Sequence, residues 1–276
     1  MFIRGSVKLN ELKTAGGKLR AFVKRNKKNV AAGIMLLLLA GIAYAAPRAV
    51  VDVANNAAAS AKELPIYCVD RDDKVVALTF DAAWGNEDTQ KILDILEKHN
   101  VKVTFFATGG WVETYPDDVK KIIEAGHAFG NHSENHKFMT RLTDEQKKQE
   151  LMKVHDKVQA LTGYEMCLFR PPYGDYNDAV VKVADSIGYY TIQWSVDSLD
   201  WKDYGVDSIV RTVTQHKSLD SGAIILMHNG AKYTADALDS IITNLEEQGY
   251  SFVTVAELIH TGKYHMDHTG KQIADE

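Results

Sequence analysis

The segment Gly130-Asn131-His132-Ser133-Glu134-Asn135-His136 places two histidines four positions apart. If it forms a single helical turn, both imidazole rings lie on one face, and Ser133 and Asn135 face elsewhere. Neutral imidazole is a common ligand of zinc and related metals, and two such ligands leave room for a carboxylate and a water. The same spacing also fits an exposed histidine pair on a solvated turn, so the rest of the chain has to decide between these interpretations.

Short apolar or β-branched runs alternate with amphipathic stretches on both sides of this segment. We expect strands at 75–80, 103–107, 128–130, 168–170, 191–194, 223–227 and 251–253. We expect helices at 87–99, 117–125, 143–161, 178–187, 208–216 and 235–248. About seven strands, most of which return through a helix, predict an α/β fold whose parallel sheet is closed or nearly closed into a distorted (β/α) barrel. An open doubly wound sheet is the alternative.

Polar side chains stand at the predicted carboxyl ends of these strands, which is where a parallel barrel carries its catalytic groups. They are Asp81, His132, His136, Arg170, Asp197, Asp200 and His228. Each alone has an ordinary explanation, such as a helix cap or a surface ion pair. Together, at equivalent positions, they predict a catalytic rim.

The charge of the chain is unevenly distributed. Residues 1–29 hold nine of the 32 Lys and Arg but only one of the 37 Asp and Glu, so the remainder has a net charge of −13. An acidic body argues against a nucleic-acid partner, because affinity for nucleic acid comes largely from neutralising phosphates. No strand is followed by a Gly-rich phosphate loop, which argues against a nucleotide.

We expect the basic residues 1–29 to form a cytoplasmic leader, because they precede an uncharged apolar segment at 30–46. That segment is long enough for a transmembrane signal anchor, which would place the rest outside the cytoplasm. Ala43-Tyr44-Ala45 also fits a cleavage site, so secretion after cleavage near Ala45 is the alternative. We expect a linker at 47–73, a catalytic domain at 74–260 and a polar, solvated tail at 261–276. Outside the cytoplasm, Cys68 and Cys167 could pair or stay as thiols.

Five motifs on the predicted rim resemble those of the polysaccharide deacetylase family, also called the NodB-homology domain or carbohydrate esterase family 4. In chain order they are TFDAAW (Thr79–Trp84), HSENH (His132–His136), RPPYG (Arg170–Gly174), DSLDW (Asp197–Trp201) and ILMHN (Ile225–Asn229). The resemblance covers about residues 74–260. It implies a distorted (β/α) barrel that uses a divalent metal, zinc with cobalt or manganese as alternatives, to remove acetyl groups from N-acetylated sugars of a polymer.

The resemblance also implies which residues hold the metal and activate the water, on what we call the metal side of the site. His132 and His136 correspond to metal ligands, and Asp81 corresponds to the general base, which Arg170 would hold in place. The backbone N–H of Tyr173 would help to bind the oxyanion.

On the other side, the resemblance implies that His228 is the general acid that protonates the leaving amine, oriented by Asp200. Trp201 and Leu226 would line a slot for the acetyl methyl group. This division suits amide hydrolysis, which needs an activated water, a stabilised oxyanion and a proton for the amine.

Ala82 departs from the family pattern, which has a second carboxylate here as the third metal ligand. Asp81 itself could complete the site, or Asn86, Glu87 or Asp88 could reach it. Otherwise the protein would bind glycan with weak or no catalysis. We expect an exported N-deacetylase whose most suitable polymer is peptidoglycan, with an inactive glycan-binding protein as the alternative.

Overall fold

The computed structural model describes residues 62–275. The predicted leader, the predicted membrane segment and most of the predicted linker fall in residues 1–61, outside the described residues. Within 62–275, no helix combines the length and the apolar character needed to cross a membrane. By its internal contacts, the chain from Glu63 onward is one compact unit.

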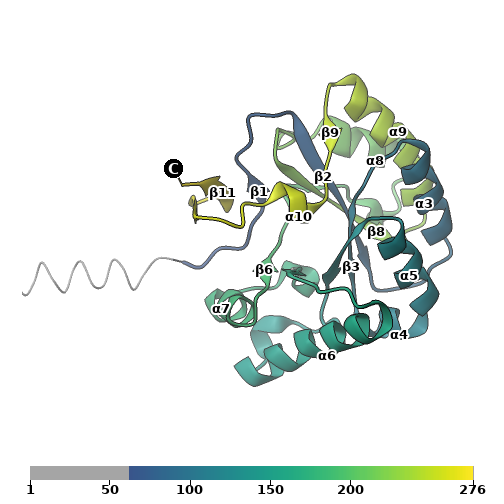
Figure 1. The fold of residues 1–276 in the computed structure, drawn as a ribbon. Coiled ribbons are helices and arrows are strands. Elements are labelled where there is room, and N and C mark those ends of the chain that lie inside the picture. The colour runs from purple at the N-terminus through teal and green to yellow at the C-terminus, as the bar shows by residue number, and fades with distance from the viewer. Residues whose placement is uncertain (1–61, 276) are drawn as a thin grey trace, which may run out of the picture. The chain divides into compact units, whose positions relative to one another are not determined.

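Seven parallel strands form the centre of the sheet, which curls into the half-barrel visible in Figure 1. They are β2 (Val75–Ala82), β3 (Thr104–Ala107), β4 (Ala128–Asn131), β5 (Leu168–Phe169), β6 (Tyr190–Thr191), β7 (Val196–Asp197) and β8 (Ala223–Asn229). Strand β2 lies between β3 and β8, the sheet continues from β3 through β6, and β7 pairs with β8. The predicted α/β fold with a parallel sheet is therefore confirmed, but the sheet curls into a half-barrel and is not closed, and two-residue β7 was not predicted.

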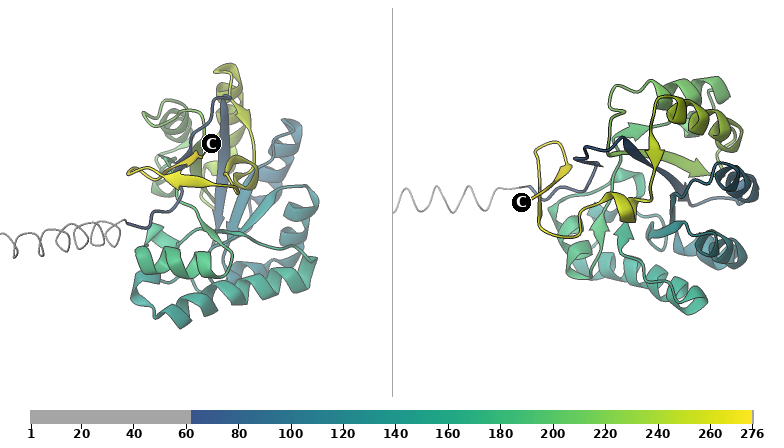
Figure 2. Two further views of the ribbon diagram at one scale, coloured as in Figure 1. Left: turned by 60° about the vertical axis from the view of Figure 1, so that its left-hand side comes forward. Right: turned by 45° about the horizontal axis from the view of Figure 1, so that its top comes forward.

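Helices connect the strands and cover the outer, convex face of the sheet (Figures 1 and 2). They are α3 (Thr89–Lys98), α4 (Gly109–Thr114), α5 (Pro116–Glu124), α6 (Asp144–Thr162), α7 (Asp178–Ser186), α8 (Val206–Thr214) and α9 (Thr234–Glu247). The longest, α6, begins at a capping box between Thr143 and Gln146. It ends at Gly163, whose φ of 73° is a left-handed conformation that costs glycine little.

The alternation of side chains along β2 divides the core into two layers. Val76, Leu78 and Phe80 pack in the large apolar cluster between sheet and helices. Val75 and Ala77 belong instead to a smaller cluster inside the curl, which α10 (Val255–Leu258) helps to close. Asp81 follows this inner alternation, so the end of β2 presents its carboxylate to the concave side.

The C-terminal residues correct the prediction of a solvated tail. Strands β10 (Tyr264–Met266) and β11 (Lys271–Ala274) form a hairpin, and β11 pairs in parallel with β1 (Cys68–Val69). The buried Gln272 side chain also accepts a hydrogen bond from the backbone N–H of His260 and donates one to its carbonyl. The two ends of the described chain are therefore joined through the sheet. Cys68 and Cys167 are separate, unpaired thiols.

Candidate active site

A pocket of about 400 Å³ opens at the carboxyl ends of the parallel strands. Its lining is made of Asp81, Ala83, Trp84, His132, His136, Tyr173, Gly174, Trp194, Asp197, Trp201, Leu226 and His228. Each of the five sequence motifs contributes to this lining, so the structure brings the predicted rim residues together in one place. The volume suits a sugar-sized ligand.

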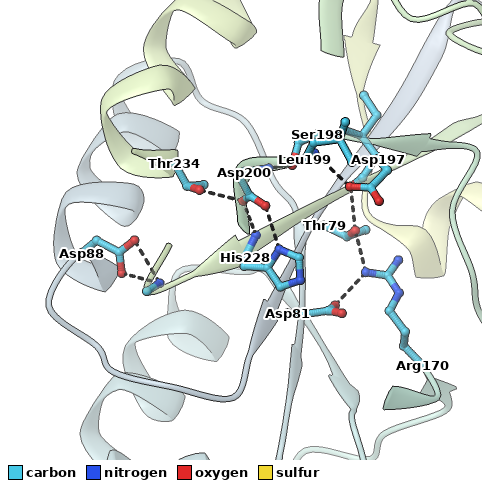
Figure 3. A network of polar contacts seen from close by, with 12 residues as sticks. Thr79, Asp81, Asp88, Arg170, Asp197, Ser198, Leu199, Asp200, His228 and Thr234 are labelled. Atoms are coloured by element: carbon cyan, nitrogen blue, oxygen red, sulfur yellow. Dashed lines mark hydrogen bonds and ion pairs between the residues drawn. The ribbon is translucent and has the colours of Figure 1, made fainter. Parts of the chain in front are cut away.

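Arg170 holds Asp81 from beneath the pocket (Figure 3). Its Nη1 donates to Asp81 Oδ1 and to Thr79 Oγ1, both at 2.8 Å, and its Nη2 donates to the carbonyl of Gln193. Burial by itself would raise the pKa of Asp81, but the Arg170 guanidinium and the nearby histidines outweigh it and hold that pKa below its ordinary value. Asp81 is therefore a carboxylate fixed in one orientation at neutral pH.

The two histidines meet as predicted, but not through a helical turn. Ser133 and His136 have φ values of 64° and 50°, which a right-handed helix does not allow, and residues 132–136 contain no helix. The chain instead turns back on itself, and the two imidazole rings lie 4.9 Å apart between centroids. Ser133 is held in this turn because its N–H donates to the side chain of the preceding Asn131.

His132 has the protonation state that a metal ligand needs. Its Nδ1 lies 2.8 Å from the carbonyl of Arg170, so Nδ1 carries the proton and the lone pair of Nε2 remains available. That Nε2 is 3.6 Å from Asp81 Oδ2. Burial lowers the pKa of His132 to about 4, which keeps the ring neutral. Burial also lowers the pKa of His136.

These donors fit two positions of a divalent metal site, and Asp81 is a neighbouring carboxylate. Ala82 adds nothing to the pocket, because it is fully buried and packs in the helix-facing apolar cluster. Among residues 62–275, no group of three or more His, Cys, Asp or Glu side chains is arranged as a metal site. The set is therefore incomplete by one ligand compared with an ordinary three-ligand catalytic site.

The three residues suggested as replacements for the missing carboxylate do not line the pocket. Both oxygens of Asp88 accept from the backbone N–H of Gly230, and Asn86 donates to Asp118. The structure gives Glu87 no place in the pocket either.

His228 also lines the pocket, and the buried Asp200 holds it in place (Figure 3). Asp200 Oδ1 lies 2.8 Å from His228 Nδ1, and Asp200 Oδ2 accepts from the His228 backbone N–H at 2.7 Å and from Thr234 Oγ1 at 2.6 Å. Burial by itself would lower the pKa of His228, but the hydrogen bond and the charge of Asp200 outweigh it and raise that pKa. The ring can therefore carry a proton into the pocket on Nε2.

Several lining residues received no role from the sequence. Trp84 lies within a recognised motif, and its ring is 6.0 Å from that of His136 and 5.9 Å from that of His228. Asp197 was noted at a strand end but not assigned, and Trp194 was not noted. Tyr173, Trp201 and Leu226 line the pocket where the resemblance placed them.

The arrangement of a fixed carboxylate, two neutral histidines and a carboxylate-held histidine around one pocket is that of a hydrolase active site. The chain matches the polysaccharide deacetylase family over residues 69–192. It is 37% identical over 201 residues to the peptidoglycan-N-acetylmuramic acid deacetylase PdaA of Bacillus subtilis, covering 70% of this chain and 74% of that protein. This protein therefore belongs to the polysaccharide deacetylase family.

Other relatives in the family include the peptidoglycan-N-acetylglucosamine deacetylase PgdA of Listeria monocytogenes, which is 39% identical over 205 residues. That match covers 73% of this chain but only 43% of PgdA, so this chain spans less than half of it. These named relatives are hydrolases of a linear amide bond, the N-acetyl group of an amino sugar.

Among solved structures, wild-type BA3943 of Bacillus anthracis, described as a CE4 family pseudoenzyme, is 39% identical with a TM-score of 0.68. The match covers 75% of this chain and 69% of that one. A BA3943 mutant described as having restored enzymatic activity is 40% identical, also with a TM-score of 0.68, covering 75% and 72%. The structure of Bacillus subtilis PdaA is 36% identical with a TM-score of 0.65, covering 70% and 84%.

Proposed function

We propose that this protein is a metal-dependent N-deacetylase that removes acetyl groups from the amino sugars of peptidoglycan. The proposal rests on two ionisable side chains that lie in one pocket, each with its protonation state set by a neighbouring residue. Asp81 is kept ionised by Arg170, and His228 is kept protonatable by Asp200. Amide hydrolysis needs both a proton acceptor for the attacking water and a proton donor for the departing amine.

The residues then divide the proton transfers and the binding of the acetyl group among them. Asp81 accepts a proton from the attacking water, and Arg170 keeps its carboxylate oriented. His228 gives its Nε2 proton to the amine nitrogen as the C–N bond breaks, and Asp200 stabilises the protonated ring before that transfer. The backbone N–H of Tyr173 donates to the oxyanion, and Leu226 and Trp201 enclose the acetyl methyl group.

The metal would be held by His132 and His136, with Asp81 as the third donor. When bound, a divalent ion, zinc with cobalt or manganese as alternatives, supplies Lewis-acid polarisation of the water and the amide carbonyl. Its affinity is expected to be lower than at a site with three dedicated ligands, because Asp81 is shared with Arg170.

Peptidoglycan is the proposed polymer because the named relatives act on it and because the sequence predicts export. We place the catalytic domain outside the cytoplasm, anchored to the cell membrane by residues 30–46, with secretion after cleavage near Ala45 as the alternative. No nucleic acid or nucleotide is needed for this reaction.

A second candidate is a glycan-binding protein without turnover. Two observations favour it: Ala82 supplies no metal ligand, and the similar BA3943 is described as a pseudoenzyme. In both candidate functions the pocket binds glycan. They differ in whether a metal ion is bound and in whether the amide bond is cleaved.

One experiment separates the two candidates. The protein is purified without chelator or affinity-tag histidines, and its metal content and acetate release from peptidoglycan are measured on the same sample. About one metal per chain, with acetate release that a chelator abolishes, is expected for the deacetylase. No metal and no acetate after addition of zinc, cobalt or manganese would refute the deacetylase and support the binding protein.

A further inference from the structure

The turn over residues 132–136 has little backbone support of its own. No backbone N–H from residue 133 to residue 137 donates to a backbone carbonyl within the described chain, and Ser133 donates to the side chain of Asn131 instead. Ser133 and His136 also have positive φ values of 64° and 50°. Such conformations cost residues other than glycine free energy and persist only where the surroundings enforce them. The turn is therefore held by side chains from elsewhere in the chain.

The carboxylate of Glu150 on α6 makes the first of these contacts. Its Oε2 accepts from the backbone N–H of Asn135 at 2.8 Å, and its Oε1 accepts from Asn135 Nδ2 at 2.9 Å and from Lys137 Nζ at 2.8 Å. Asn135 and Lys137 are the two neighbours of His136 in the chain. The Glu150 side chain is only 7% exposed, so these bonds are shielded from water. One buried carboxylate thus holds the residues on both sides of the second histidine.

Lys157, two turns further along α6, makes the second contact. Its Nζ donates to Glu134 Oε1, in the middle of the turn, at 2.6 Å, and to Glu113 Oε2 at 2.9 Å. Residues seven apart lie on the same face of a helix, so Glu150 and Lys157 contact the turn together. A Cβ at Gly109 would lie 1.8 Å from Glu134 Oε2, so this glycine leaves the space that Glu134 occupies.

Both oxygens of Glu150 act as acceptors, because the group is ionised. Burial by itself would raise the pKa of Glu150, but the hydrogen bonds from Lys137 and Asn135 outweigh it and hold that pKa below its ordinary value. An ionised carboxylate offers acceptors only, which suits the donors that face it. A glutamine here would turn an NH2 group towards at least one of those donors. The contact therefore depends on the charge of Glu150 and not only on the volume of its side chain.

We propose that Glu150 and Lys157 are positioning residues for the proposed metal ligands. They hold the turn in the conformation in which the rings of His132 and His136 converge. The inference rests on the proposed metal-dependent function and concerns how its ligands are kept in place. Neither positioning residue lines the pocket, so neither acts on the substrate directly. Two ligands that already converge lose little conformational freedom when a cation binds, and this matters more where Ala82 supplies no further ligand.

The test measures the affinity of the full-length protein for Co²⁺, together with the visible absorption of the bound ion, which reports the geometry of its ligands. Glu150→Gln should lower the affinity by about tenfold or more, because residues outside the ligand shell contribute about 10–100-fold to metal affinity. The cobalt spectrum should change as well, since the two rings no longer approach the ion at fixed angles. Lys157→Gln should lower the affinity by about two- to fivefold, because its side chain is 30% exposed and its ion pairs are partly screened.

Glu145→Gln and Lys153→Gln are the matched controls. Both residues are exposed on the same helix, and the substitutions remove the same charges, so the cobalt affinity and spectrum should stay unchanged. Circular dichroism and thermal unfolding verify the fold of each variant. A role in stability alone predicts a lower melting temperature for Glu150→Gln with an unchanged cobalt spectrum, and that result would overturn the proposal. If Glu150→Gln does not fold, Lys157→Gln carries the test, since its side chain is partly exposed.

The two rings can also be observed without a metal. Nuclear Overhauser effects between His132 and His136 are expected in metal-free wild type, because the ring centroids lie 4.9 Å apart, and should be lost in Glu150→Gln. None of these measurements depends on acetate release. Loss of the ring contacts in a protein whose wild type binds no cobalt would reject the metal-dependent deacetylase and support the positioning role. Unchanged ring contacts and unchanged cobalt affinity in the folded variants would overturn the positioning role alone.

Discussion

The two sides of the pocket are supported to different degrees. On the acid side, both oxygens of Asp200 are engaged, and they hold His228 through its ring and through its backbone N–H. On the metal side, His132 and His136 approach one another, but the neighbouring Ala82 offers no donor and packs away from the pocket. Asp81 is a carboxylate close to His132, and Arg170 already binds one of its oxygens.

This difference indicates where the reaction is limited. The proposed proton donor, His228, is oriented by Asp200 in the structure, whereas the proposed cation would be held by fewer dedicated ligands than a catalytic site ordinarily uses. Metal occupancy, and not proton transfer, is therefore expected to set the rate under metal-poor conditions. Three substitutions test this comparison.

Asp81→Asn should have the largest effect, because Asp81 is the proposed proton acceptor and would also neighbour the proposed metal. Acetate release should fall by roughly 10²–10⁴-fold, the usual contribution of a general base. Loss of the charge also leaves the buried Arg170 without its ion pair, so the melting temperature should fall as well. Asp72→Asn, at an exposed site, is the control. Unchanged acetate release from folded Asp81→Asn protein would show that the base is a different residue.

Asp200→Asn tests the acid side and should lower acetate release by about 10²-fold. In wild type, the Asp200 charge raises the pKa of His228, so the protonated acid persists to higher pH. Removing that charge lowers the pKa, and the alkaline limb of the pH profile should move to lower pH. Thr234→Val keeps the charge but removes one hydrogen bond to Asp200, so its shift should be smaller. If the alkaline limb does not move, that part of the pH profile reflects the titration of a group other than His228.

Ala82→Asp tests the metal side. At saturating metal, it should change the rate of acetate release less than the other two substitutions do. If metal binding turns the end of β2 so that the new carboxylate reaches the histidines, metal affinity should rise by about tenfold or more, since even partners outside the ligand shell change it by 10–100-fold. Without metal, the buried carboxylate should lower the free energy of unfolding by about 1–3 kcal/mol. Titration with zinc followed by thermal unfolding measures both effects, and Ala82→Val is the volume control. Unchanged affinity would show that a side chain at residue 82 does not reach the metal.

Most of the strand order along the chain could be predicted because each long strand carries its own apolar pattern. Val75–Ala82 is fully buried and Ala223–Asn229 is nearly so, and both were recognised as continuous apolar runs. Val196–Asp197 and Cys68–Val69 are only two residues long, too short for any periodicity. The hairpin over Tyr264–Ala274 was missed because its polar sequence gains stability only by pairing with Cys68–Val69.

The candidate site was likewise predictable from the sequence only in part. The chemical groups, namely Asp81, the histidine pair, Arg170, Asp200 and His228, were evident from residue type and position at strand ends. The irregular turn that joins His132 to His136 was not, because its positive φ values depend on contacts such as the Asn131 side chain. The grouping of Phe138 with Tyr173 was also not evident, since the two residues follow different strands.

The sequence alone determined the parallel α/β sheet and the residues that meet at its rim. Apolar periodicity and residue chemistry are local properties, and the carboxyl ends of parallel strands necessarily share one edge. Only the tertiary structure decided which nitrogen of His132 and of His228 is available, that Ala82 faces the helices, and that Phe138 stacks on Tyr173. Those properties depend on backbone direction and on partners distant in the chain, and neither of these is encoded in a short stretch of residues.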